Sequence, residues 1–224
     1  MRFALLLTAL ICGPALAERQ SFPPVDQAGR DSTLVAFRDE LRAMVAARDT
    51  EGVIAATCPD LYLSHGGNGG PEEFRANLAL DPATLPEQDQ QNADELRKGY
   101  WADLENTLSQ PGYFDDEGEF WMPHQWQITL PASLDPYMAY YVTGQNVALR
   151  QAAVRSAPKL ALISHEVVII PSYVDAADYQ RVVLTDGTQG YMHSDFLWSM
   201  VGHRAAFVKS DAGEWQLCTF VAGD

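Results

Sequence analysis

The sequence predicts an α+β protein with a mostly helical N-terminal domain, followed by a small C-terminal β-barrel that has an extra hairpin. Three observations lead to this prediction. Apolar residues recur at helical spacing in the first half of the chain, which is typical of amphipathic helices. Alternating and β-branched runs, typical of strands, follow after residue 137. Residues 131–136 begin and end with proline, which is typical of a linker between the two parts.

The first 17 residues have the pattern of a cleaved export signal. Arg2 provides a short positive region, residues 3–12 are apolar, and Ala15-Leu16-Ala17 is a small-x-small cleavage site. The apolar run is too short to span a bilayer in the mature protein. We therefore expect cleavage after Ala17 and a secreted or periplasmic protein without a mature transmembrane segment.

Residues 18–30 are polar and contain a proline pair, so we expect a linker there, followed by the mostly helical domain at residues 31–135. Its helices have clear start signals, because Asp, Ser and Thr side chains cap helix N-termini and proline fits the first turn. We expect the helices to begin at Asp31 or Ser32, at Asp49 or Thr50, at Pro71, and at about Asp94. In the last helix the expected core residues are Leu96, Trp101, Leu104 and Leu108.

Short strands are expected between and after these helices. Pro59 is expected to end the second helix, and a strand at residues 61–63 follows. Residues 113–121 form a hairpin around an acidic turn, and residues 126–130 fit one more strand. A C-terminal hairpin at residues 204–221 is expected to extend the barrel, with a bridge to the first domain as the alternative.

Residues 137–224 are expected to form the barrel and this hairpin. Asp186-Gly187 is a tight hairpin turn, because glycine tolerates the positive φ that such turns require. Residues 194–197 fit a single closing turn of helix. The expected strands of the barrel lie at residues 146–150, 160–170, 179–184 and 190–192.

Two motifs in this part of the chain indicate a family. Asn146-Val147-Ala148-Leu149-Arg150 matches an Asn-Val-x-x-Arg opening strand, and Gly190-Tyr191-Met192 matches a closing Gly-aromatic-hydrophobic strand before a short segment that ends at Leu197. On these residues, the stretch 140–197 resembles a bacterial SH3-like (SH3b) domain, and it covers about a quarter of the chain. The resemblance implies an SH3-like β-barrel in a secreted protein of uncharacterised function.

A binding site on this barrel is the leading hypothesis. In SH3-like domains aromatic rings line a shallow peptide groove, and a barrel of this size cannot bury all of its six tyrosines. Packing of the tyrosines in the core, and an internal pair between Arg150 and Asp195, are the structural alternatives. The candidate ligand-binding residues are Tyr140, Arg150, Tyr179, Tyr191 and Asp195.

A glycine run in the first domain provides an alternative site. Exposed amides of residues 66–70 at a helix start can receive an anionic or carbonyl group, although the loop lacks the Lys and the Ser or Thr of a phosphate loop. A tight strand-to-helix connection explains the same glycines structurally. The residues of this alternative pocket are His65, Gly66, Gly67, Asn68 and Glu72.

Other chemistry is mostly missing from the sequence. Five histidines are scattered without zinc-ligand spacing, and no serine-nucleophile motif occurs, so we expect no metal, no cofactor and no catalytic residue among them. A glycosidase carboxylate pair among Asp60, Glu72 and Asp116 is the weaker alternative, so catalysis stays open. Cys58 and Cys218 are compatible with a disulfide, which export favours, or with two separate buried thiols.

The net charge of −15 argues against a nucleic-acid partner, which requires a basic surface. The export signal and the SH3-like resemblance together give the leading hypothesis. It is a non-enzymatic binding or interaction protein of the cell envelope, with peptidoglycan or an envelope protein as the partner. One alternative is a small-ligand-binding or weakly hydrolytic first domain centred on His65 and the glycine run. The other is a protein–protein scaffold.

Overall fold

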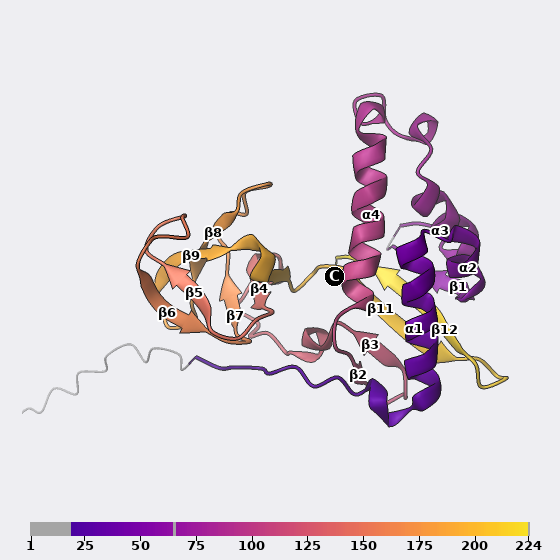
Figure 1. Ribbon diagram of the computed structural model, residues 1–224, viewed down its shortest axis with the longest axis horizontal. Coiled ribbons are helices and arrows are strands. Elements are labelled where there is room, and N and C mark those ends of the chain that lie inside the picture. Colours follow the sequence, from indigo (N-terminus) through magenta and orange to yellow (C-terminus); the bar gives the residue numbers. More distant parts are fainter. Residues whose placement is uncertain (1–18, 65, 224) are drawn as a thin grey trace, which may run out of the picture.

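A computed structural model describes residues 19–64 and 66–223 (Figure 1). These residues contain four α-helices and two β-sheets, which confirms the predicted α+β class. The helices and one sheet form a helical lobe, and the second sheet forms a β-rich lobe beside it (Figure 1). The predicted signal peptide, residues 1–17, lies outside the described residues.

Helix α1 (Ser32–Ala47) begins where the sequence predicts. The Asp31 carboxylate caps it by accepting hydrogen bonds from the backbone amides of Thr33 and Leu34, at 2.8 and 3.3 Å. Asp49 caps the next helix in the same way, through the amide of Gly52 at 3.0 Å. The remaining helices are α2 (Thr50–Ala55), α3 (Gly70–Ala79) and α4 (Ala93–Leu108).

Helix α4 packs on the core with its C-terminal half. Trp101, Leu104 and Leu108 are buried as predicted, and the Trp101 indole donates a hydrogen bond to the carbonyl of Leu78 at 3.0 Å. Leu96 was predicted to face the core but is 46% exposed. Figure 1 shows that the first turns of α4 extend beyond the sheet, so Leu96 does not reach the core beneath the helices.

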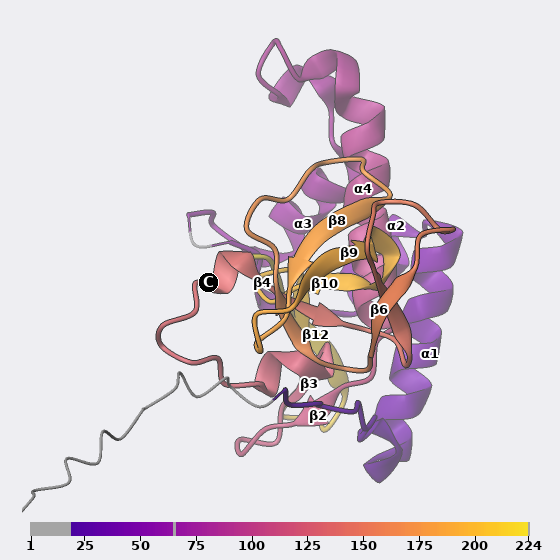
Figure 2. The same ribbon diagram turned by 90° about the vertical axis from the view of Figure 1, so that its left-hand side faces the viewer.

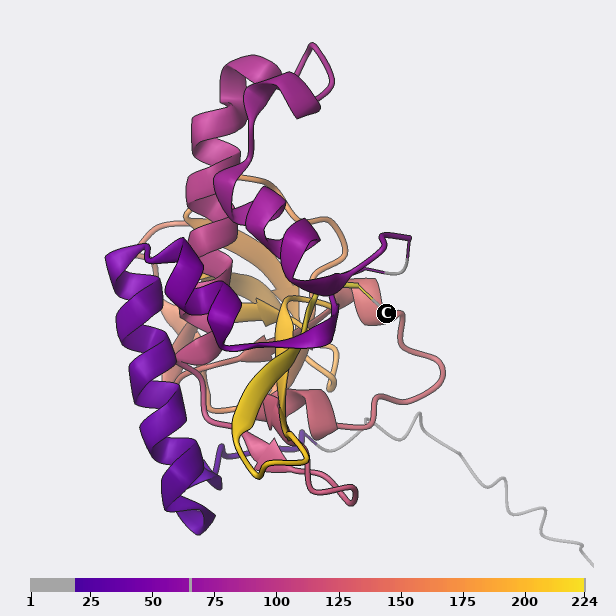
Figure 3. The same ribbon diagram turned by 90° about the vertical axis from the view of Figure 1, so that its right-hand side faces the viewer.

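The helical lobe contains a five-stranded sheet in the order β1-β12-β11-β3-β2. Its strands are β1 (Thr57–Tyr62), β2 (Tyr113–Phe114), β3 (Phe120–Met122), β11 (Arg204–Lys209) and β12 (Trp215–Val221). β12 pairs in parallel with β1 and antiparallel with β11, which in turn pairs with β3. Figure 3 shows the β11–β12 hairpin, in yellow, beside β1 and the helices.

The C-terminal hairpin therefore lies in the sheet of the helical lobe. The leading expectation, that it extends the barrel, is wrong, and the alternative of a link to the first domain is nearer to the observed pairing. The hairpin's apolar side chains Phe207, Leu217 and Phe220 are fully or almost fully buried in the core beneath the helices. Alternation along a strand predicts a buried face but does not identify the sheet that the strand joins.

β1 also differs from the expected elements. The second helix ends at Ala55, and the strand that follows includes Pro59, the residue that was expected only to terminate the helix. Proline is tolerated at this position because β1 is an edge strand, where a missing backbone donor can face away from the sheet.

The β-rich lobe is a seven-stranded sheet in the order β10-β4-β7-β8-β9-β5-β6 (Figure 2). No strand pair among the described residues joins its edges β10 and β6, so the sheet is open and is not a closed barrel. The closing turn expected at residues 194–197 is the 3-10 helix η6 (Ser194–Phe196), whereas the strand expected at 126–130 is replaced by the 3-10 helix η4 (His124–Gln127). The strands are β4 (Ala139–Val142), β5 (Val147–Arg150), β6 (Lys159–Ile163), β7 (Val167–Ile169), β8 (Tyr179–Val183), β9 (Gln189–His193) and β10 (Leu197–Ser199).

Each lobe has its own apolar core, and a smaller cluster lies at the junction between them. In this cluster Tyr141 of β4 and Met200 are buried. Phe22 from the N-terminal segment and Ile128 from the segment after η4 pack against them. The two lobes therefore share buried apolar surface, which the hydrophobic effect stabilises.

Residues 19–30, predicted to be a linker, form a strap that contacts both lobes (Figure 1). On the β-rich side, Ser21 forms an antiparallel bridge with Glu166. On the helical side, the Asp26 carboxylate lies 3.0 Å from the guanidinium of Arg38. These contacts make the strap part of the folded structure. The polar, proline-containing composition that predicted a linker is equally suited to a segment that runs extended along other elements.

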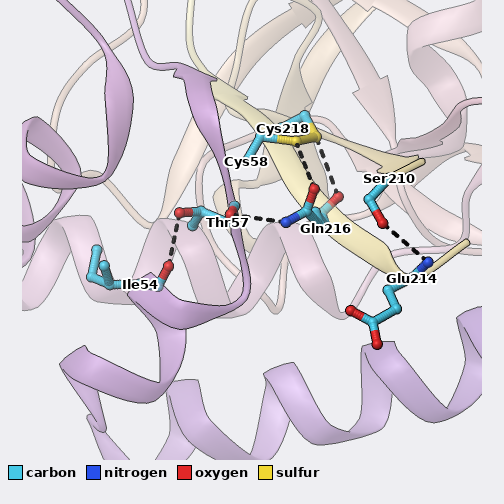
Figure 4. The surroundings of a disulfide bond; sticks show 7 residues. All are labelled: Ile54, Thr57, Cys58, Ser210, Glu214, Gln216 and Cys218. Carbon is cyan, nitrogen blue, oxygen red and sulfur yellow. Dashed lines mark hydrogen bonds between the residues drawn. A yellow bond between two sulfur atoms is a disulfide. The ribbon is translucent and has the colours of Figure 1, made fainter. Parts of the chain in front are cut away.

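Cys58 of β1 and Cys218 of β12 form a disulfide (Figure 4). Their Cα atoms are 4.9 Å apart and 160 residues apart in sequence, and Gln216 Oε1 lies 3.8 Å from the Cys58 sulfur. The sequence alone is compatible with a disulfide or with two separate thiols, because the two cysteines fall in different predicted domains. The pairing of β12 with β1 brings them together.

Replacing both cysteines by serine, Cys58→Ser with Cys218→Ser, is expected to lower the free energy of unfolding by about 2–4 kcal/mol, because the crosslink restricts the unfolded chain over a long loop. Urea denaturation followed by circular dichroism measures this loss. Reduced wild-type protein serves as the control and should unfold at the same midpoint as the variant. Equal stability of the variant and the oxidised wild type would contradict the expectation.

Candidate functional site

An open groove of about 660 Å³ lies on the outer surface of the β-rich lobe, which faces the viewer in Figure 2. Its walls come from β5, the loop at residues 151–158, the start of β8, the end of β9 and η6. Strand alternation creates the floor, because Leu149 and Met192 point into the core while Arg150 and His193 point outward. The same alternation that builds the core therefore presents polar and aromatic side chains to the groove.

Three rings form a row along one side of the groove. Tyr179 of β8 and His193 of β9 are directly opposite each other in the strand pairing, and their ring centroids are 5.0 Å apart in an edge-to-face arrangement. Phe196 of η6 continues the row, with its centroid 6.3 Å from that of His193. The side chain of Phe196 is 41% exposed, so the row presents apolar surface to solvent.

Charged groups of both signs border the row. Arg150 Nη1 donates a hydrogen bond to the carbonyl of Ala157 at 3.0 Å, which fixes the guanidinium between β5 and its following loop. Arg155 is exposed on that loop. Asp178 and Asp195 provide carboxylates, and the backbone amide of Asp195 lies 3.3 Å from His193 Nδ1. The groove therefore offers guanidinium donors, carboxylate acceptors and aromatic surface together.

The structure brings three of the five predicted binding residues into this groove, namely Arg150, Tyr179 and Asp195. Tyr191 is the cross-strand partner of Arg150 but does not line the groove. Tyr140 lies elsewhere, on β4, where its ring stacks on that of Tyr173 with centroids 5.6 Å apart, and burial raises the pKa of its hydroxyl.

Sequence reasoning missed His193 and Phe196, as well as Asp178 and the exposed Val154 on the loop. A signal was available for the first two. His193 follows Tyr191 at a spacing of two residues, so it occupies the same outward face of β9. Phe196 is an apolar residue in a segment expected to be a single helical turn, which cannot bury every side chain.

The glycine run of the alternative site is internally satisfied. The Glu73 carboxylate accepts hydrogen bonds from the amides of Asn68 and Gly69, at 2.8 and 2.9 Å, and Ser64 Oγ accepts one from the amide of Gly67 at 2.8 Å. Glu72 is exposed and forms an ion pair with Arg75 at 2.6 Å. His65 lies outside the described residues. An anion from solvent would have to displace Glu73, so these contacts favour a structural role for Gly67, Asn68 and Gly69.

Residues 19–64 and 66–223 also contain neither of two further features. In that part of the chain, no three His, Cys, Asp or Glu side chains are arranged to hold a metal ion. None of the helices described has the length and apolar composition that crossing a bilayer requires.

Comparisons with protein-family models, curated proteins and solved structures find no match to the chain. The SH3-like resemblance therefore stays a prediction.

Gly190 of the closing motif lies where two strands approach closely. A Cβ atom at this position would be 2.7 Å from the carbonyl oxygen of Arg150 and 2.7 Å from Leu149 Cγ. Gly190→Ala is therefore expected to push β9 away from β5 and to lower the free energy of unfolding by about 1–3 kcal/mol.

Thermal or urea unfolding of Gly190→Ala measures this effect. Gly99→Ala is the matched control, because Gly99 lies in α4 and a Cβ atom there meets nothing within 4 Å. That substitution is expected to stabilise the protein by about 0.5–1 kcal/mol. A Gly190→Ala protein as stable as the wild type would show that the close approach is not required.

Proposed function

We propose that the protein is a non-enzymatic binding protein of the cell envelope, and that the groove of the β-rich lobe binds a peptide or a peptide-bearing fragment of peptidoglycan. The observation that supports this most is the row Tyr179, His193 and Phe196 beside Arg150 in an open groove. Flat aromatic rings bind extended chains at little entropic cost. The placement in the envelope rests on the export signal expected in residues 1–17.

We also infer that the β-rich lobe is an SH3-like domain. Its two motif segments lie on neighbouring strands, since Arg150 of β5 pairs with Tyr191 of β9. A 3-10 turn, η6, precedes the last strand, and that strand returns to pair with the first, as Leu197 of β10 lies opposite Val142 of β4. These features support the resemblance independently of composition.

The charges of the groove indicate the chemistry of the ligand. The whole chain has a net charge of −15, so Arg150 and Arg155 form a local exception that can bind a carboxylate. Asp178 and Asp195 can accept hydrogen bonds from amide or ammonium groups. A short peptide with a free carboxylate has both kinds of group, and its apolar side chains would contact Phe196 and Val154.

A scaffold function is a second candidate, favoured by one observation. Leu160 and Leu162 lie on the edge strand β6, and each is 49% exposed. Exposed apolar residues on an edge strand are suited to pairing with a strand of another protein. Binding at β6 would leave the groove on β5, β8 and β9 free.

The groove hypothesis predicts that Arg155→Ala combined with Phe196→Ala reduces retention of the purified protein on insoluble peptidoglycan on the order of tenfold, because arginine and aromatic anchors dominate such interfaces. Both side chains are exposed, so the variant should remain folded. Co-sedimentation over a range of peptidoglycan concentrations measures the apparent affinity.

Leu96→Ala is the matched control, since Leu96 is 46% exposed on α4 in the other lobe. It should bind as the wild type does. Retention of the groove variant at the wild-type level would contradict the proposal. Loss of binding in a Leu160→Ser, Leu162→Ser variant, with the groove variant unaffected, would instead favour the scaffold function.

A further inference from the structure

Phe22 of the strap is held by both lobes at their junction. The hydroxyl of Tyr141, on β4, donates a hydrogen bond to the Phe22 carbonyl oxygen at 2.8 Å, and His124 of η4 approaches the same oxygen with Nε2 at 3.3 Å. The Phe22 amide donates to the carbonyl of His165 at 2.6 Å. The position of the strap therefore depends on one tyrosine and two histidines.

Both imidazoles act as donors in this network. Burial raises the pKa of Tyr141, so its hydroxyl keeps the proton that it donates to Phe22. His165 Nδ1, which lies 3.2 Å from that hydroxyl oxygen, must then donate to it. The second nitrogen of His124, Nδ1, is buried and has no hydrogen-bond partner among the described residues. His124 is 4% exposed, so a proton on Nδ1 would place a charge where water does not solvate it.

The surrounding groups give no compensating negative charge. Glu166, beside His165, accepts two hydrogen bonds from the Arg19 guanidinium, at 2.6 and 2.8 Å, so its charge is already neutralised by the strap. Tyr141 stays uncharged between the two imidazoles, with its ring centroid 5.3 Å from that of His124 and 6.2 Å from that of His165. Two imidazolium ions here would repel each other.

We propose that the strap is a pH-sensitive clamp, which holds the two lobes together while His124 and His165 are neutral and is released when these side chains bind protons. Release breaks the hydrogen bonds of Phe22 and allows water to reach both imidazoles. The ion pair between Asp26 and Arg38 lies at the other end of the strap and keeps the strap attached to the helical lobe.

The direction of the effect follows from the two histidines. Burial lowers the pKa of His124 and the pKa of His165 below the ordinary value of 6.5. In the released state the solvated imidazoles titrate near about 6.5, so that state binds more protons at acidic pH. The clamp therefore has its full stability above this pH, loses stability as the pH falls through about 6.5, and reaches its full loss below the lowered pKa values.

Hydrogen exchange of the Phe22 amide in the full chain tests the clamp. Protection factors, which remove the intrinsic effect of pH on exchange, are compared at about pH 7.5 and about pH 5. We expect the protection of Phe22 to fall on the order of tenfold at the lower pH, whereas core amides of α1 and β11 keep theirs.

The variant His124→Gln with His165→Asn keeps an N–H donor at each position but cannot be protonated, and Asn tolerates the positive φ of 55° at residue 165. It should keep its strap protection at both pH values. The control His193→Gln, a substitution in the groove, should lose strap protection at the lower pH to the same extent as the wild type. Three results would overturn the proposal. They are a wild-type strap that keeps its protection at the lower pH, a loss of protection in α1 together with the strap, and a double variant whose strap loses as much protection as that of the wild type. If the double variant does not fold, His165→Asn alone must show a smaller loss than the wild type.

Discussion

The parallel pairing of β12 with β1 is the contact on which the rest of the structure depends. β12 lies between β1 and β11, so the last strand of the chain is an inner strand of the sheet that the helices cover. Its side chains Leu217 and Phe220 complete the core of the helical lobe, and the disulfide between Cys58 and Cys218 links the same two strands covalently. The helical lobe is therefore built from both ends of the chain, and the β-rich lobe is an insertion between β3 and β11.

This arrangement explains why the groove is accessible. The inserted lobe meets the helical lobe through β4, the start of β7 and the end of β10, where Tyr141, Val167 and Met200 are buried and Phe22 packs against them. β9, β5 and β6 lie at the opposite side of the β-rich lobe, away from the helices (Figure 1). The residues that line the groove belong mostly to this outer side, so a ligand can reach them without any movement of the two lobes.

Local features of the fold could be predicted from the sequence, and long-range features could not. The caps at Asp31 and Asp49 and the turn η6 depend on neighbouring residues, and they lie where they were expected. The partner of the C-terminal hairpin and the exposure of Leu96 depend on distant segments, which a periodic pattern does not contain. The candidate site follows the same division. The opening motif strand indicated Arg150, and the expected tyrosine-lined groove indicated Tyr179. Only the folded sheet shows that His193 and Phe196 share their groove, while Tyr140 does not.

The insertion of one lobe into the other also has a consequence for the order of synthesis. The chain is made from its N-terminus, so all residues of the β-rich lobe emerge before β11 and β12. The inserted lobe can complete its core while the helical lobe still lacks an inner strand, because strand pairing over long sequence separations forms late. Until residue 218 has been made, Cys58 has no partner and the helices have an unfinished surface. During this interval the nascent chain exposes apolar residues of the helical lobe, and it is then most dependent on chaperones that keep it from aggregating.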